Sequence, residues 1–133
     1  MQTLIGFDFG KQRIGIAVGQ SITGTATALC TIRSRSGKPD WDRITDLVDH
    51  WQPDALVVGL PLHDDGSDSD ISKAARQFIR QLDDHYGLPI HTMDERLSSH
   101  AAKQHIKGST SKQGVDAVAA MIILQNWMET EHT

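Results

Sequence analysis

Apolar runs and helical repeats of apolar residues divide the chain into strands and helices. Five short apolar runs predict strands, at 3–9, 14–18, 25–32, 54–61 and 88–93. Four segments in which apolar residues return every three or four positions predict helices, at 41–51, 69–85, 99–106 and 115–128. The predicted order is β-β-β-α-β-α-β-α-α, which is typical of an α/β fold.

The connections predict how these strands pair. Gly10, Lys11 and Gln12 form a tight turn, so the first two strands must be antiparallel, because a parallel return needs about a dozen residues. The last two strands are reached through helices, and right-handed crossovers would place them on the far side of the first strand. We therefore expect a mixed five-stranded sheet with helices on both faces. Its first three strands form an antiparallel meander, and its last two run parallel to the first.

Length and local signals complete this prediction. The 133 residues predict a single domain, with 129–133 as a frayed tail. Asp40 is expected to cap the first helix, and Gly87 to end the second. The acidic stretch at 64–70 lacks the spacing of a calcium loop, so a solvated loop with a helix cap is expected there.

Composition narrows the functional classes. Thirteen basic and 17 acidic residues give a net charge of −4, so bulk charge cannot attract nucleic acid, and local basic patches or metal ions must do so. The single cysteine, Cys30, excludes an internal disulfide and is expected to be a buried thiol. No segment resembles a signal peptide, and no run of about 18 apolar residues occurs, so we expect a soluble cytoplasmic protein without a membrane segment.

Three acidic residues converge in the predicted sheet. Asp8 lies at the carboxyl end of the first strand, Glu95 follows the fifth, and Asp116 opens the last helix in an apolar stretch. Ligands gather at strand carboxyl ends in such sheets, and hard cations take oxygen ligands. We therefore predict a shared Mg²⁺ or Mn²⁺ site. Such a site can hold two ions, one generating a hydroxide nucleophile and the other stabilising the leaving oxygen of a phosphodiester.

Each carboxylate also has a structural alternative. Asp8 could pair with Arg13 or Lys11 across the hairpin, and Glu95 could pair with Arg96. Asp116 could be an acidic residue that the dipole favours at a helix N-terminus.

Four motifs in order make the pattern specific. They are GFDFGKQRIGIAV at 6–18, VVGLP at 57–61, DERLS at 94–98 and VDAVAAMIIL at 115–124. Together they resemble the YqgF family, also called RuvX, over residues 4 to about 128. Gln12 departs from the expected Lys or Thr before the arginine, without affecting a predicted catalytic residue.

The resemblance implies an RNase H-like fold and a metal-dependent nuclease related to Holliday junction resolvases. It implies maturation of the 5′ end of precursor 16S ribosomal RNA, with DNA junction resolution as the alternative. The acidic positions of the family correspond to Asp8, Glu95 and Asp116, as both catalytic and metal-binding residues.

Other residues are candidates for substrate binding. Arg13 and Arg96 could hold phosphate oxygens, or could pair with a site carboxylate. Gly59 could let a substrate backbone approach the sheet, or could turn the chain. A basic, serine-rich segment at 107–114 is expected to be a loop that tracks a sugar–phosphate backbone. The lysines placed near this backbone are Lys103, Lys107 and Lys112.

Two further groups of residues are less specific. Arg33, Arg35 and Lys38 form a second, weaker basic patch. The tryptophans lie on apolar helical faces, which favours core packing over base stacking; they are Trp41, Trp51 and Trp127.

Two other functional classes stay open from the sequence. Phosphoryl transfer from ATP would fit a similar Asp-x-Gly hairpin, but it needs a second lobe. A non-catalytic RNA- or ribosome-binding module would keep the fold without the chemistry. The oligomeric state is also open, since a junction resolvase requires a twofold dimer whereas single-strand processing does not.

Overall fold

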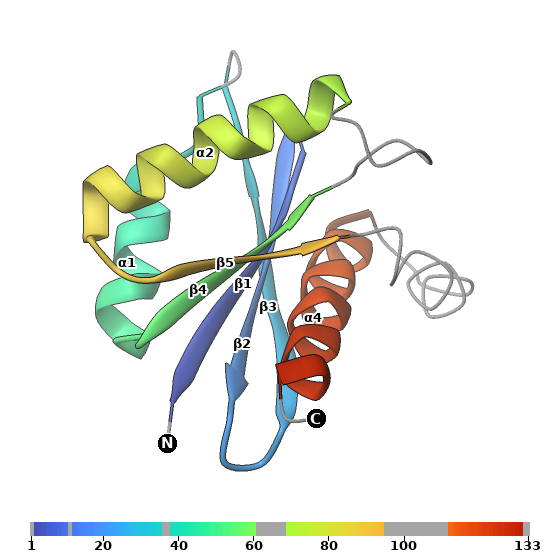
Figure 1. Cartoon of the computed structure of the whole chain (residues 1–133). Coiled ribbons are helices and arrows are strands. Elements are labelled where there is room, and N and C mark those ends of the chain that lie inside the picture. The colour runs from blue at the N-terminus through green and yellow to red at the C-terminus, as the bar shows by residue number, and fades with distance from the viewer. Residues whose placement is uncertain (1, 11, 36–37, 61–68, 95–111, 132–133) are drawn as a thin grey trace.

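A five-stranded mixed sheet forms the centre of the protein (Figure 1). The structure is a computed structural model, and it describes residues 2–10, 12–35, 38–60, 69–94 and 112–131. The strands are β1 (Thr3–Phe9), β2 (Arg13–Gln20), β3 (Thr25–Arg33), β4 (Ala55–Leu60) and β5 (Ile90–Asp94). They lie in the order β3-β2-β1-β4-β5, which confirms the predicted topology with β1 at the centre.

The strand directions also agree with the prediction. β2 pairs antiparallel with both β1 and β3, whereas β4 pairs parallel with β1 and β5 parallel with β4. The carboxyl ends of β1, β3, β4 and β5 therefore share one edge of the sheet, and β2 begins there. We call this edge the carboxyl edge.

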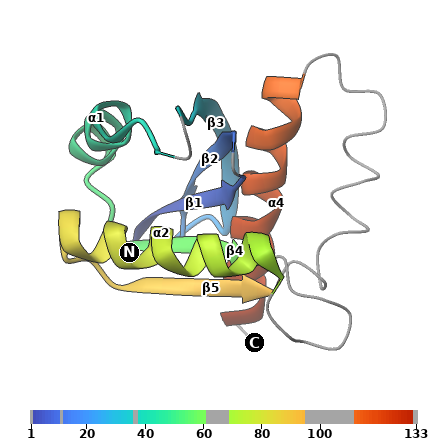
Figure 2. The same cartoon turned by 90° about the horizontal axis from the view of Figure 1, so that it is seen from above.

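Helices cover both faces of the sheet. They are α1 (Trp41–Trp51), α2 (Asp70–Tyr86) and α4 (Lys112–Glu131). Seen from above, α1 and α4 lie on opposite sides of the central strands (Figure 2). The predicted helix at 99–106 lies outside the described residues.

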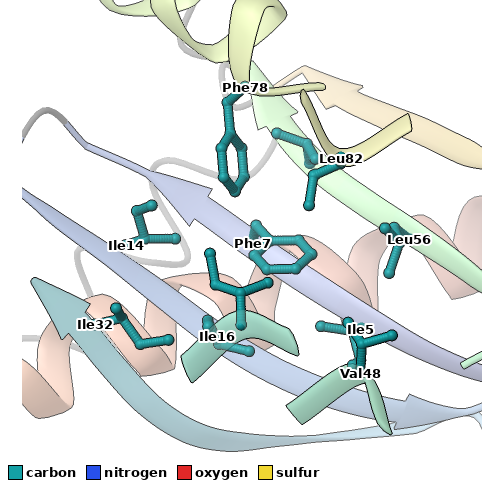
Figure 3. Packing of buried hydrophobic residues seen from close by; sticks show 11 residues of the cluster. Ile5, Phe7, Ile14, Ile16, Ile32, Val48, Leu56, Phe78 and Leu82 are labelled. Carbon is teal, nitrogen blue, oxygen red and sulfur yellow. The ribbon is translucent and has the colours of Figure 1, made fainter. Parts of the chain in front are cut away.

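The face under α1 and α2 carries the larger apolar cluster (Figure 3). Phe7 of β1 packs edge-on against Phe78 of α2, with ring centroids 5.5 Å apart. Ile5 and Phe7 point to this face because alternate residues of a strand share a face. Val48 of α1 and Leu82 of α2 close the cluster from the helix side. This packing holds β1 rigidly at the centre of the sheet.

The opposite face is shaped for close approach of α4. Gly6 and Gly19 present no side chain to the helix, and a Cβ at either position would lie 2.9 Å from Leu124 of α4. At Gly15 of β2 the helix is closer still, because a Cβ there would overlap the carbonyl oxygen of Asp116. Glycine is therefore required at Gly15 so that the α4 backbone can rest directly on the sheet.

A side chain of α4 also fixes the helix along β3. The amide of Gln125 accepts a hydrogen bond from Ala26 N at 3.0 Å and donates one to Gly24 O at 2.6 Å. Both groups are at or next to the start of β3, far from the carboxyl edge. Together with the contact at Gly15, these bonds set the position of α4 at two separate points.

The helix ends mostly follow the sequence signals. Asp40 caps α1 by accepting a hydrogen bond from Arg43 N at 3.3 Å, and Gly87 ends α2 in the left-handed conformation. Ser69 caps α2, as expected of the end of the acidic stretch at 64–70, whose residues 64–68 are not described.

One predicted boundary was wrong. The sequence predicted a loop through 107–114 and a helix over 115–128 with a frayed end, but α4 begins at Lys112 and continues to Glu131. Gly114 has low helix propensity, and packing of the apolar residues of α4 on the sheet overrides that local preference.

The remaining structural predictions concern packing. Trp41 and Trp51 pack against the cluster under α1 and α2, and Trp127 packs against the cluster under α4, which confirms their core role.

Burial raises the pKa of the Cys30 thiol despite the nearby Arg43, which makes the thiol less reactive. None of the described helices has the length and apolar character needed to cross a membrane.

The contact at Gly15 gives a direct test of this packing. Gly15→Ala should lower the free energy of unfolding by about 2 kcal/mol, because the added methyl group collides with backbone and α4 must shift. Gly19→Ala is the matched control, since the atoms nearest to its methyl group belong to the side chains of Leu124 and Met128 instead of to backbone. Urea unfolding of both variants should show the smaller loss for Gly19→Ala, and equal losses would contradict a backbone-limited contact at Gly15.

Candidate active site

Asp8 lies at the carboxyl edge on the face that α4 covers. It is the second-last residue of β1 and is partly buried. Leu4 and Gly6, which share its face by strand alternation, both meet α4. The carboxylate is therefore directed to the α4 side of the sheet rather than into the large cluster around Phe7.

The glycine contact brings Asp116 to the same place. Asp8 is the direct cross-strand partner of Gly15, and Gly15 is the residue on which the backbone of Asp116 rests. Directly opposed residues of an antiparallel pair have Cα atoms about 5 Å apart. Two of the three predicted site residues, Asp8 and Asp116, thus lie on either side of one glycine at the carboxyl edge.

Arg13 completes this group. It lies two residues before Gly15 on the same face of β2, and its Nε is 3.4 Å from Oδ2 of Asp116. The two side chains are 32% and 26% exposed, so the ion pair is partly shielded from water. This contact matches the structural alternative for Arg13, a pair with a site carboxylate, which the sequence left open.

The ion pair leaves the Asp116 carboxylate incompletely satisfied. Its Oδ2 atom is buried and accepts no hydrogen bond from any residue that the structure describes. Burial raises the pKa of Asp116, and the attraction of Arg13 lowers it by less. An incompletely satisfied carboxylate oxygen is a suitable donor for a hard cation.

The dipole alternative for Asp116 is wrong. The sequence placed this residue at the start of the last helix, where the positive end of the helix dipole would stabilise it. Because α4 begins at Lys112, Asp116 falls in the second turn, and the first turn has no acidic residue. The dipole effect decays within the first turn, so it does not account for this carboxylate.

The third predicted carboxylate, Glu95, lies outside the described residues. It follows Asp94, the last residue of β5, which pairs with Leu60 at the carboxyl edge. Within the described ranges, no three acidic, histidine or cysteine side chains gather closely enough to hold a metal ion.

The predicted substrate-binding residues divide into two groups. Gly59 is a buried residue within β4, so the idea that it turns the chain was wrong. It follows Val58, which pairs with Phe7, and therefore lies level with Asp8. Lys112 is the first residue of α4 instead of part of a loop. The others lie outside the described residues; they are Arg96, Lys103 and Lys107.

Comparison with known proteins identifies the family. The sequence model of RuvX, described as Holliday junction resolvase, matches residues 2–130. The chain belongs to the RuvX family. This assignment confirms the predicted class of enzyme, a nuclease that hydrolyses phosphodiester bonds, over phosphoryl transfer from ATP.

Curated relatives support the assignment along the whole chain. A protein of Azotobacter vinelandii named "Putative pre-16S rRNA nuclease" is 47% identical over 94% of this chain and 92% of its own. A protein of Pseudomonas putida with the same name is 46% identical over 97% of this chain and 96% of its own.

Solved structures show the fold of the RuvX chain. T. thermophilus RuvC in complex with Holliday junction substrate matches with a TM-score of 0.63 at 14% identity, covering 99% of this chain and 96% of that one. The Fowlpox virus resolvase, solved with Holliday junction DNA, matches with a TM-score of 0.58 at 14% identity, covering 98% and 99%. These similarities confirm the predicted RNase H-like fold.

Sequence reasoning missed the role of Gly15. Its motif was noted for Asp8 and Arg13, but the glycine itself decides where Asp116 sits. A signal was present, because small residues alternate along β2 as Gly15, Ala17 and Gly19, which is typical of a strand face that another backbone approaches closely.

The raised pKa of Asp116 predicts how its charge affects stability. A carboxyl whose folded pKa is raised makes the protein less stable as pH rises from its unfolded value, about 3.9, through its folded value. In EDTA, Asp116→Asn should therefore raise the free energy of unfolding at pH 7 by about 1 kcal/mol or less, and the gain should vanish near pH 3.

Urea unfolding between pH 3 and pH 7 measures this difference. Asp84→Asn, an exposed change on α2, is the control and should show no such trend. A loss of stability in Asp116→Asn at pH 7 would contradict a carboxylate that is destabilising overall.

Proposed function

We propose that this RuvX protein is a divalent-metal-dependent nuclease that processes the 5′ end of precursor 16S rRNA. The observation that carries the chemistry is the placement of Asp8 and Asp116 on either side of Gly15, with one buried Asp116 oxygen lacking a described hydrogen-bond donor. The substrate follows from the names of relatives at 46–47% identity over nearly the full chain.

Three acidic residues are the proposed metal ligands. Asp8, Asp116 and Glu95 hold Mg²⁺ or Mn²⁺, and the site holds two ions, as the sequence predicts. Carboxylate oxygens from separate elements are the donor set that these hard cations prefer, and they tolerate one another when a cation lies between them. When bound, such ions activate water and neutralise charge on the phosphate.

The arginines are proposed to order the site around the substrate. Arg13 holds the Asp116 carboxylate in place through its Nε contact, and its position at the carboxyl edge lets it neutralise an incoming phosphate. Arg96 is proposed to bind phosphate in the same way. Gly59, level with Asp8 and without a side chain, is proposed to let the substrate backbone approach this edge of the sheet.

The lysines before and at the start of α4 are proposed to bind the substrate strand away from the reacting phosphate; they are Lys103, Lys107 and Lys112. Such contacts position the nucleic acid and carry no sequence information of their own.

Resolution of DNA junctions is the second candidate function. The RuvX family description names a Holliday junction resolvase, and two of the similar structures contain that substrate. This reaction needs two strands cut symmetrically and hence a twofold dimer. A cytoplasmic monomer that acts on one strand fits the rRNA function instead. The third candidate function is a non-catalytic ribosome-binding module.

Cleavage assays separate these readings. Precursor rRNA with its 5′ leader and a four-way DNA junction are offered side by side with Mn²⁺. We expect rRNA cleavage, and Asp8→Asn and Asp116→Asn should each lower its rate at least about a hundredfold, because each removes a metal ligand.

The control is Asp84→Asn, which removes an exposed carboxylate of α2 and should leave the rate unchanged. Faster cleavage of the junction than of rRNA would favour resolution. Cleavage by Asp8→Asn at the wild-type rate would refute the proposed site. No cleavage by the wild type, with normal rRNA binding, would favour the non-catalytic module.

A further inference from the structure

Three exposed basic side chains gather where β3 ends. Arg33 is the last residue of β3, and Arg35 and Lys38 follow in the connection to α1. Among the described residues, none of the three makes an ion pair. This cluster differs from Arg13, whose charge is matched by Asp116.

Strand register ties this cluster to the active site. Arg33 is the direct cross-strand partner of Arg13, so the two arginines lie side by side on the face of the sheet that carries Asp8 and that α4 covers. β3 is two strands from β1, which corresponds to about 10 Å. The cluster therefore lies beside the candidate active site at the carboxyl edge.

Backbone pairing fixes the other two residues. Arg35 and Lys38 form an antiparallel bridge with reciprocal N–H···O bonds of 2.9 Å. Directly opposed residues in such a bridge project to the same side, so both cationic side chains leave the chain together. All three basic residues line one open hollow of about 560 Å³ that reaches Trp41.

The acidic residues of the hollow do not cancel this charge by pairing. Asp40 is engaged as the cap of α1, where its Oδ1 accepts from Arg43 N. Asp42 is exposed in the first turn of α1, where the helix dipole favours it. Like charges directly opposite each other are unfavourable, so the Arg13–Arg33 and Arg35–Lys38 pairs favour a ligand of opposite charge.

We propose that Arg33, Arg35 and Lys38 form a phosphate-binding subsite that holds the sugar–phosphate backbone of the substrate strand beside the active site. The inference rests on the proposed function, since it assigns a second contact to the same nucleic-acid substrate. Binding there is sequence-independent and positions the strand relative to Asp8 and Asp116.

Binding in EDTA tests the subsite separately from cleavage. The probes are a labelled single-stranded RNA that spans the 5′ end of 16S rRNA and a labelled four-way DNA junction. Fluorescence anisotropy measures the Kd of each probe across a series of KCl concentrations. Arg33→Gln/Arg35→Gln should bind RNA about tenfold more weakly near 0.15 M salt. Its slope of log Kd against log salt should fall by about 1.4, because two phosphate contacts are lost.

The matched control is Arg76→Gln/Arg80→Gln, which removes two exposed arginines from α2 on the other face of the sheet. It changes the net charge equally and should leave Kd and the salt slope almost unchanged. Arg33→Lys/Arg35→Lys keeps the charge and should retain most of the affinity. Lys38→Gln alone should show about half the change in salt slope.

The outcomes separate this proposal from the one it rests on. The subsite is supported if Arg33→Gln/Arg35→Gln binds a probe more weakly and the α2 control does not. The probe that is affected, RNA, junction or both, shows which nucleic acid the subsite holds. Equal loss in the α2 control, or no loss in either variant, overturns it. If the wild type cleaves neither substrate, the nuclease proposal fails, whereas the binding result still decides the subsite.

Discussion

The close contact between α4 and β2 at Gly15 is the constraint on which the candidate site depends. The Asp116 backbone occupies the space that a side chain would take, and Asp8 is the direct strand partner of that glycine. The placement of Asp8 and Asp116 on either side of Gly15 is thus a consequence of backbone packing. Gln125 holds the far part of the same helix through two hydrogen bonds, so α4 cannot pivot freely about the contact.

The two faces of the sheet contribute differently to the structure. The face under α1 and α2 buries large apolar side chains such as Phe7 and Phe78, and supplies the rigidity that a preorganised site requires. The face under α4 uses glycine to bring charged groups together at the carboxyl edge. There Arg13 compensates Asp116 in part, and burial still raises the pKa of Asp116. The remaining demand for positive charge is what a divalent cation would meet.

Much of this arrangement could be predicted from the sequence because local signals agreed with one another. The tight turn after Asp8, the crossover lengths and the capping residue Asp40 were sufficient for the sheet order and the first helix. The start of α4 was missed because Gly114 disfavours a helix locally, whereas packing of distant residues extends the helix. The Arg13–Asp116 pair was one of several alternatives, since a sequence does not show which partner a charge finds in space.

The central claim is that Asp8 and Asp116 bind the same divalent ion. Calorimetric titration of Mn²⁺ into the wild type, Asp8→Asn, Asp116→Asn and the double variant tests it most directly, with Asp84→Asn as control. We expect each single variant to weaken Mn²⁺ binding at least about tenfold, and the double variant to lose less than the sum of the two free-energy changes, because ligands of one ion are coupled. Wild-type Mn²⁺ affinity in Asp116→Asn would contradict the account.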